Sequence, residues 1–329
     1  MKPMTNRSRR TGVLGLLCGL AVVVTPALAQ APATWPDKPI HFVVPYPPGT
    51  PPDLLTRHVA DQLSKDLQQP VLVENKVGAG GSIGTEFVAR ANPDGYTFLV
   101  TPSGTLTIAP WMRKLGYSVD DFIAVAELGE ISSIATVRPD APFASFKEFV
   151  AAARANPGKY TFATNGPGSA TQLVGKILHK QAGINVLEVP YKGATESMTD
   201  LIAGRVDIMY APVTVPQIKA GRLKGLGTVS DRRNAEIPDV PTLAEQGFDL
   251  SKVPGSWFGI FAPKGTAEGI VQKLAERTRQ LMDSPETRRK LQPLSIDVVF
   301  RGPQDFSRLV RADAAAMRAV IQSEGLQAK

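Results

Sequence analysis

Apolar and polar positions follow two patterns along this chain, and segments with the pattern of a β-strand alternate with segments that have the pattern of a helix. Short runs rich in β-branched and aromatic residues at 40–44, 71–75 and 96–101 have the composition of buried strands. Between the first two runs, apolar residues recur every fourth position, the spacing of one helix face, at Leu55, Val59, Leu63 and Leu67. Strands that alternate with helices are typical of parallel, doubly wound sheets. The segment 40–101 therefore predicts a βαβαβ unit.

The same rhythm resumes after 124–138, which we interpret as an irregular bridge. Ser145 and Glu148 have the spacing of a capping box and predict a helix start, and Pro157-Gly158 predicts its end. The pattern then predicts strands at 160–165, 186–191, 206–212, 223–230 and 256–263, and helices at 169–181, 195–203, 266–282 and 303–323, with a shorter helix after Pro285. The segment 237–247 is expected to be a loop that contains a short helix.

Two α/β lobes account for this length of alternating pattern. We expect residues 30–132 to form the first segment of lobe 1, residues 133–253 to form lobe 2, and residues 254–329 to return to lobe 1. The chain would then cross between the lobes twice.

The N-terminus has the three parts of a secretory signal peptide. A basic region without acids is followed by an uncharged apolar run and by Ala27-Leu28-Ala29. We expect residues 1–29 to be removed by cleavage after Ala29 and the mature protein to lie in the periplasm. Loss of the four basic residues lowers the formal net charge from +7 to +3, so the mature chain is only mildly basic.

Composition disfavours several classes of partner. The only cysteine, Cys18, lies in the apolar run, so the mature chain has no disulfide and depends on core packing. The three histidines lack the spacing of metal ligands. Nucleic-acid binding is disfavoured by export and by the scatter of basic pairs such as Arg232-Arg233.

Five segments carry a family resemblance by their joint order and spacing. They are KPIHFVVPYPPGTPPDLLTR, VENKVGAGGSIGTEFVARANPDGYTFLV, VPYKGATESMTDLIAGRVDIM, IPDVPTLAEQG and SWFGIFAPKGT. From about Trp35 to Leu326, the chain resembles the periplasmic receptors of tripartite tricarboxylate transporters, the Bug family of solute-binding proteins.

The resemblance implies a type II periplasmic-binding fold with two doubly wound α/β lobes joined by two crossing strands. It implies a small carboxylate ligand in the cleft, held largely by loop backbone groups and ordered waters. It also implies delivery to membrane permease subunits, no cofactor and no catalysis. We expect a monomer that binds a small organic anion and no nucleic acid.

The first candidate loop is PYPPGTPPD, which departs from a glycine-rich family form at Thr50, Pro51 and Pro52. Thr50 and Asp53 have the spacing of a capping box in which each would bond the backbone N–H of the other. In this interpretation the loop starts a helix well but is a weak anion cradle, because proline has no N–H.

A binding role for the same loop remains open. The Gly49 N–H and the Tyr46 and Thr50 hydroxyls could face a ligand, and we keep Asp53 among the candidate cleft residues.

The second candidate loop, 163–173, is the stronger one. Ligands bind beyond the carboxyl ends of strands, and a helix N-terminus favours anions. The candidate residues here are Thr164, Asn165, Gly168, Ser169 and Thr171. Gln172 stands where the family often has His, and an ordinary strand–turn–helix connection is the alternative.

Further candidates are Ser103 and Thr105 after the strand at 96–101, and Tyr191 in VPYKG. A capped turn is an equal alternative for the first two, and Lys192 is more simply a solvated charge. Ala211 is expected near the ligand. No arginine is placed by motif to pair with a ligand carboxylate, so neutral donors are expected to hold it.

Two other functions remain to be weighed. Gly80-Gly81-Ser82-Ile83-Gly84 matches the nucleophile elbow of a serine esterase, but only His179 follows it as a possible base. A sensor that presents a carboxylate to a membrane protein would have the same binding lobes. The sequence favours a non-enzymatic solute-binding receptor.

Overall fold

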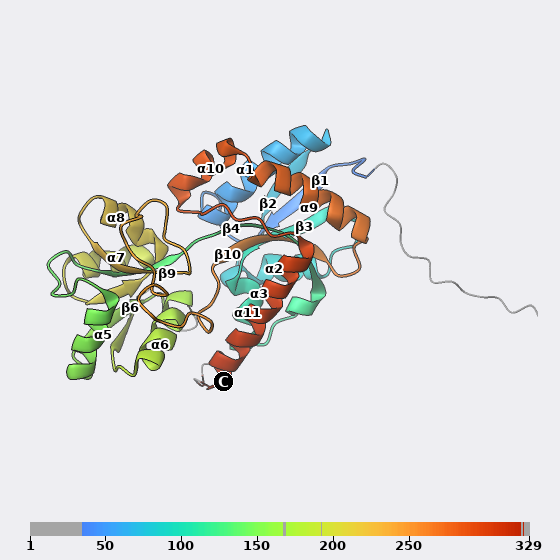
Figure 1. Ribbon diagram of the computed structural model, residues 1–329. Helices are drawn as coiled ribbons and strands as arrows, with labels where there is room; N and C mark the ends of the chain where they lie inside the picture. The colour runs from blue at the N-terminus through green and yellow to red at the C-terminus, as the bar shows by residue number, and fades with distance from the viewer. Residues whose placement is uncertain (1–34, 167–168, 192, 324, 326–329) are drawn as a thin grey trace, which may run out of the picture.

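The computed structural model describes residues 35–166, 169–191, 193–323 and 325. The expected signal peptide, Cys18, Gly168 and Lys192 lie outside the described residues. In Figure 1 the described chain forms two lobes side by side, with the blue N-terminal and orange to red C-terminal segments in the same lobe.

The first lobe is built on a mixed five-stranded sheet, in the order β2-β1-β3-β10-β4. Its strands are β1 (Ile40–Val44), β2 (Val71–Asn75), β3 (Thr97–Pro102), β4 (Phe122–Glu130) and β10 (Trp257–Pro263). Strand β1 pairs in parallel with β2 and β3, whereas β10 is antiparallel to both of its neighbours. Strand β10, which comes late in the sequence, therefore lies in the same sheet as the N-terminal strands.

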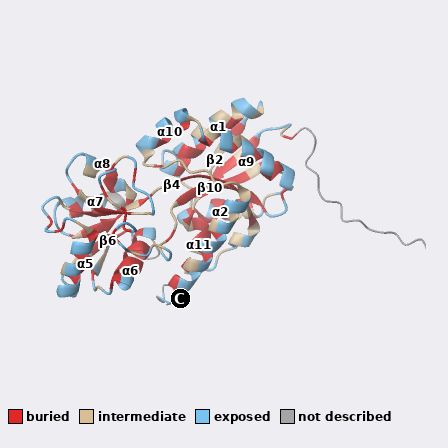
Figure 2. Ribbon diagram, viewed as in Figure 1, coloured by how far each residue is buried: buried red, intermediate tan, exposed pale blue. Residues whose placement is uncertain are grey.

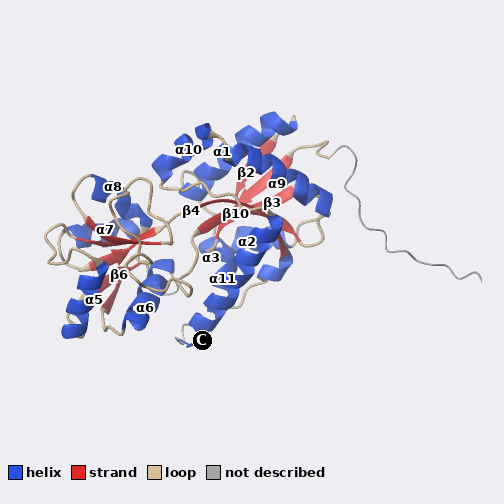
Figure 3. Ribbon diagram, viewed as in Figure 1, coloured by secondary structure: helices blue, strands red, loops and turns tan. Residues whose placement is uncertain are grey.

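Helices cover both faces of this sheet (Figure 3). They are α1 (Pro51–Leu67), α2 (Ser82–Ala89), α3 (Gly104–Thr107), α4 (Ala109–Met112), α9 (Glu268–Met282), α10 (Pro285–Leu291) and α11 (Pro303–Ser323). The expected fourfold spacing holds in α1, where Leu55, Val59 and Leu63 are all buried.

The second lobe repeats the same sheet plan, in the order β7-β6-β8-β5-β9. Its strands are β5 (Ser133–Val137), β6 (Thr161–Thr164), β7 (Leu187–Pro190), β8 (Ile208–Tyr210) and β9 (Lys224–Val229). Its helices are α5 (Phe146–Ala155), α6 (Ala170–Ala182), α7 (Ala194–Ile202) and α8 (Val215–Lys219). The predicted two-lobe α/β fold is confirmed.

Two stretches of chain connect the sheets, one short and one long. Only Ile131 and Ser132 separate β4 from β5, and residues 230–256 lead from β9 back to β10. We retain the lobe boundaries at 132/133 and 253/254 as a proposal, since each falls between strands of different sheets.

Two predictions of secondary structure were wrong. Most of the supposed irregular bridge at 124–138 lies in β4 and β5. The strand character was hidden by Glu127, a fully buried carboxylate that pairs with Arg301. The segment 237–247 forms turns without a helix, and Thr242 makes a β-bridge to Thr228 in β9.

Each lobe has its own apolar core (Figure 2). Phe42, Leu55 and Phe98 belong to the core of the first lobe, and Phe146 and Phe162 to that of the second. A further apolar cluster takes residues from both lobes, namely Ile108, Leu173, Ile177, Met317, Val320 and Ile321. The end of α11 thus packs against α6 of the opposite lobe, so any hinge motion must rearrange this contact.

Asp313 of α11 gives the fold a predictable pH dependence. Its Oδ2 accepts a hydrogen bond of 2.6 Å from Trp257 Nε1, and burial raises the pKa of its carboxyl to about 6. The folded protein then holds this proton more tightly than the unfolded chain, whose aspartates titrate near about 3.9. Stability from this group is greatest below pH 4 and is lost as the pH rises through 6.

We expect Asp313→Asn to remove that pH dependence, because an amide oxygen can still accept from Trp257 but does not ionise. The free energy of unfolding of the variant, relative to that of the parent, should rise by on the order of 1–3 kcal/mol when the pH is raised from 4 to 7. Urea unfolding at the two pH values measures this change. Asp305→Asn on the exposed start of α11 is the control, and equal curves for Asp313→Asn and the parent would contradict the assignment.

Candidate ligand-binding cleft

A cavity of about 860 Å³ lies between the two lobes. The first lobe contributes Tyr46, Ser103, Ile108, Met112 and Arg113 to its wall, and the second contributes Ser133, Asn165, Ser169, Thr171, Ala211 and Pro212. The crossing segments add Ile131, Pro254, Gly255 and Ser256. This volume lies within the range of about 300–1,000 Å³ that is usual for small-molecule sites.

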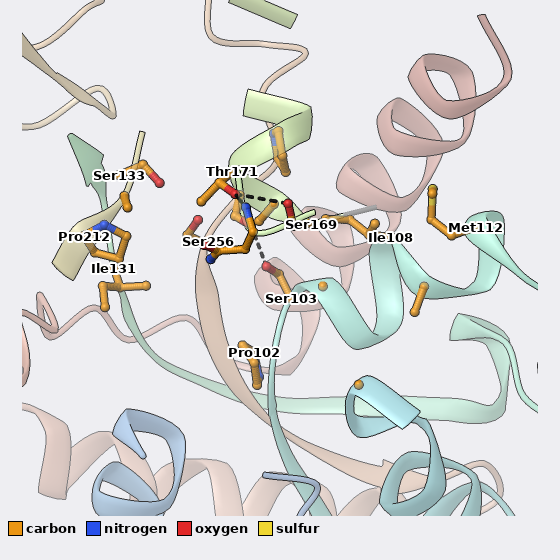
Figure 4. Close-up of a pocket in the computed structure, with 18 of the residues that line it drawn as sticks. Pro102, Ser103, Ile108, Met112, Ile131, Ser133, Ser169, Thr171, Pro212 and Ser256 are labelled. Carbon is orange, nitrogen blue, oxygen red and sulfur yellow. Dashed lines mark hydrogen bonds between the residues drawn. The ribbon is translucent and has the colours of Figure 1, made fainter. Parts of the chain in front are cut away.

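Polar groups gather in the middle of this cavity. In Figure 4, Ser103, Ser169, Thr171 and Ser256 lie close together, with Ile108 and Met112 on one side and Ile131 and Pro212 on the other. A ligand that spans the cavity would therefore meet neutral polar groups at its centre and apolar side chains around them.

The predicted second loop supplies the polar centre. Ser169 is the N-cap of α6, and its Oγ accepts from the Gln172 N–H at 3.3 Å. Thr171 Oγ1 accepts from the Asn165 N–H at 2.9 Å and lies 3.0 Å from Ser169 Oγ. If Thr171 donates to Ser169, the Ser169 hydroxyl proton is left for a ligand. A carboxylate in the cavity would select this arrangement.

Side chains with unused hydrogen-bonding capacity surround that centre. Within the described part of the chain, no hydrogen-bond partner is found for the Tyr46 hydroxyl, the side-chain amide of Asn165 or the hydroxyls of Ser133 and Ser256. Burial, with a smaller contribution from Tyr117, raises the pKa of Tyr46 to about 12, so its phenol keeps its proton. These groups can bond a polar ligand at little cost to the fold.

The predicted capping box of the first loop was wrong. Thr50 is the N-cap of α1, but its Oγ1 donates to Pro47 O at 2.7 Å instead of accepting from Asp53 N–H. The Asp53 carboxylate reaches past Thr50 and accepts from the Gly49 N–H at 2.8 Å. The physical reason is that Gly49, at φ +81°, turns its N–H toward the helix.

The polar groups of the first loop therefore bond to residues of their own lobe and not to the cavity. Asp53 is buried and also accepts from Asn75 Nδ2 and Arg57 Nε, which hold the pKa of its carboxyl below its usual range although burial opposes them. The described residues that line the cavity do not include Gly49, Thr50 or Asp53. Of the described residues in this loop, only Tyr46 lines the cavity.

Three other candidates sit behind the cavity wall. Thr105 Oγ1 bonds to Thr101 Oγ1 at 2.6 Å, and Thr164 Oγ1 donates to Glu188 at 3.0 Å; both side chains are buried. The Tyr191 hydroxyl donates to Asp200 at 2.9 Å. Ser103 does line the cavity, but its hydroxyl donates to the Gly255 carbonyl and so ties the loop to the crossing segment.

Sequence reasoning missed Arg113, Ser133 and Ser256 in the cavity wall. None lies in a glycine-rich loop at the start of a helix, which was the signal used. Arg113 follows α4, and Ser133 and Ser256 flank the two crossings between lobes. A crossing segment must run beside an interlobe cleft, so polar residues at both crossings were a usable signal for the last two. Ala211 lines the cavity as expected.

The esterase alternative finds no assembled triad. Ser82 Oγ accepts from Arg113 Nη2 at 2.7 Å and lies 3.5 Å from the Tyr117 hydroxyl. His179 bonds to Tyr210 at 2.8 Å in the other lobe, and burial lowers the pKa of its imidazole to about 3. Among the described residues, the contacts of Ser82 therefore do not include a base that would activate it.

The described ranges contain neither a cluster of metal ligands nor a helix suited to a bilayer. No group of three His, Cys, Asp or Glu side chains there could hold a metal ion. No helix between residues 35 and 323 combines the length and apolar character needed to span a bilayer.

The chain is similar to known proteins over most of its length. The chain is 33% identical over 332 residues to the "UPF0065 protein in tcbD-tcbE intergenic region" of Pseudomonas sp. strain P51, covering 99% of this chain and 97% of that one. The structure of the periplasmic binding protein BugD is 32% identical, with a TM-score of 0.70 over 90% of this chain and all of that one.

Two similar structures contain bound ligands. MatC from Rhodopseudomonas palustris, with bound malate, is 31% identical, with a TM-score of 0.69 over 87% of this chain and 100% of that one. Rpa4515 from R. palustris, with adipate, is 28% identical, with a TM-score of 0.72 over 88% of this chain and 98% of that one. Residues 55–326 match the tripartite tricarboxylate transporter family receptor TctC. This chain therefore belongs to that family of periplasmic solute-binding receptors, which includes the Bug proteins.

Proposed function

We propose that this receptor captures a small organic carboxylate in the interlobe cavity and delivers it to the membrane subunits of a tripartite tricarboxylate-type transporter. The observation that carries the proposal is the set of neutral donors that converges on the cavity from both lobes, centred on Ser169 at the start of α6. Malate and adipate in two family structures support a carboxylate as the ligand class.

Neutral groups are sufficient for such a ligand. Hydroxyl and amide donors, together with the positive end of α6, stabilise an anion without a formal counter-charge at every oxygen. Rotation of the lobes toward each other would exclude water and strengthen these bonds. We further propose that the protein acts as a monomer in the periplasm after cleavage behind Ala29.

A thermal-shift screen of carboxylates tests the binding step. A ligand that binds only the native state raises the melting temperature, by an amount that grows with its concentration. We expect carboxylates to give such shifts and uncharged analogues of the same size to give none or smaller ones. Absence of any carboxylate among the hits would overturn the proposal.

We expect Ser169→Ala to weaken binding of the best carboxylate about tenfold to a hundredfold. The substitution removes a hydroxyl donor to a charged group, a bond worth about 1.5–3 kcal/mol. Titration calorimetry measures the loss. Ser169→Thr keeps the hydroxyl and the helix cap and is the matched control, whereas equal affinities for all three proteins would exclude α6 as the grip.

Uptake measurements test the delivery step. Cells that lack this receptor should lose uptake of the bound carboxylate at concentrations near its dissociation constant, and the native chain should restore it. Normal uptake without the receptor would contradict a transport role while leaving the binding step intact.

A further inference from the structure

We propose that Arg113 determines which solutes the cleft accepts, and that it selects monocarboxylates with an apolar body by pairing with their carboxylate. This inference rests on the proposed function and narrows its ligand class. It assigns charge recognition to a residue outside the glycine-rich loops.

The charge balance of the cavity is the first argument. Among the described residues that line it, Arg113 is the only charged one. It makes no salt bridge within the described part of the chain, although most other arginines there pair with acids. A lone cation in a wall without carboxylates attracts an anion, and its charge matches one carboxylate.

The hydrogen bonds of Arg113 show how its guanidinium is held. Nη2 donates to the Ala79 carbonyl and, at 2.7 Å, to Ser82 Oγ. Both acceptors belong to the turn that begins α2, so the guanidinium is held there through one of its three nitrogens. Nε and Nη1 have no acceptor among the described residues and keep three of the five N–H donors of the group.

The turn that holds Arg113 is built for close approach. Gly80, which also lines the cavity, adopts φ +62°, and a Cβ there would lie 3.4 Å from Arg113 Nη2. The bare backbone of Gly80 leaves room beside the guanidinium. Because both two-donor forks of a guanidinium include Nη2, which is already bonded, a carboxylate would accept from Nε or from Nη1 singly, in a charge-assisted hydrogen bond.

The apolar side chains of the cavity determine the rest of the ligand. Ala109 and Met112 are the first and last residues of α4, which ends directly before Arg113, and they line the cavity with Ile108, whereas Pro212 and Val213 line it from the second lobe. A second carboxylate would meet only the neutral hydroxyls of the centre, which can hold an anion but stabilise it less than a cation does, and no second cation lines the cavity among the described residues. An aryl or alkyl body instead gains by burial against these side chains.

Binding measurements with four probes test the inference: phenylacetate, its neutral analogue phenylacetamide, malate and adipate. We expect phenylacetate to bind more tightly than malate or adipate. Arg113→Gln should weaken phenylacetate binding about tenfold to a hundredfold, the range for a lost charge-assisted bond, and should leave the weaker binding of phenylacetamide unchanged. Arg113→Lys should recover part of the affinity.

Lys114→Gln is the matched control, because it removes the same charge from an exposed neighbour that does not line the cavity. It should leave all four affinities unchanged. Raising the salt concentration from 0.05 M to 0.5 M should weaken phenylacetate binding in the parent more than in Arg113→Gln.

The outcomes separate this inference from the proposed function. If malate or adipate binds more tightly than phenylacetate, or if Arg113→Gln and Lys114→Gln have equal effects, the assignment to Arg113 is wrong and the carboxylate receptor stands. If neither these three carboxylates nor any other acid binds, both are overturned.

Discussion

Ser256→Trp is expected to lower the affinity for the best carboxylate at least a hundredfold while leaving the fold intact. The Ser256 side chain faces the polar centre of the cavity, close to Ser169 and Thr171 (Figure 4). An indole at this position would occupy the space of the ligand and displace its hydrogen bonds, a loss of roughly 3 kcal/mol or more. Titration calorimetry with the strongest carboxylate from the thermal-shift screen gives the loss directly.

The backbone of Ser256 explains why the fold should survive this change. Its carbonyl accepts from the Ile131 N–H at 2.8 Å, which ties the two crossing segments together without using the side chain. Lys252→Trp, four residues earlier on an exposed part of the same segment, adds the same indole outside the cavity and is the control. Tight binding by Ser256→Trp would place the ligand elsewhere.

Phe306→Ala is expected to reduce the free energy of unfolding by about 3–5 kcal/mol. The ring is fully buried and packs edge-on against Trp257, with centroids 5.1 Å apart, and 5.3 Å from Phe261. The ring joins α11 to Trp257 and Phe261 of β10, so its removal leaves a cavity between a strand and a long helix. A loss of this size is a large share of the about 5–15 kcal/mol that stabilises a typical protein.

Urea unfolding measures this loss as a lower midpoint with an unchanged slope. Phe87→Ala is the control, because Phe87 is 47% exposed on α2 and its truncation should cost no more than about 0.5 kcal/mol. Gly259 provides a second check. A Cβ at Gly259 would lie 2.3 Å from the Phe306 ring, so Gly259→Ala should destabilise the parent but cost much less in the Phe306→Ala background. Additive losses would show that the two residues do not meet.

The local pattern was sufficient for most helices and strands. Leu55, Val59 and Leu63 face the core as their spacing predicts, and Ser145 caps α5 by accepting from the Glu148 N–H at 3.2 Å. These features depend on residues within one or two turns of each other. The segment 124–138 failed for the opposite reason, since Glu127 can be buried in β4 only because Arg301, 174 residues later, lies beside it.

The candidate site residues also fall into two groups, those that local sequence placed correctly in the cavity and those that it did not. Tyr46, Asn165, Ser169 and Thr171 line the cavity where strand–loop–helix connections placed them, whereas Thr105, Thr164 and Tyr191 satisfy their hydroxyls inside the fold. Whether a hydroxyl faces a cleft or a neighbouring carbonyl depends on a rotation about one bond. The spacing of residues does not encode that rotation.

By itself, the sequence determined the α/β alternation, the two lobes and the family, because each follows from local periodicity or from ordered motifs along the chain. Only the tertiary structure decided that Arg113 lines the cleft and that the Gly49 N–H donates its hydrogen bond to Asp53 and not to a ligand. The reason is that a side chain meets either a ligand or its own fold according to distances across the lobes, and these distances arise only when two sheets and two crossings are assembled together.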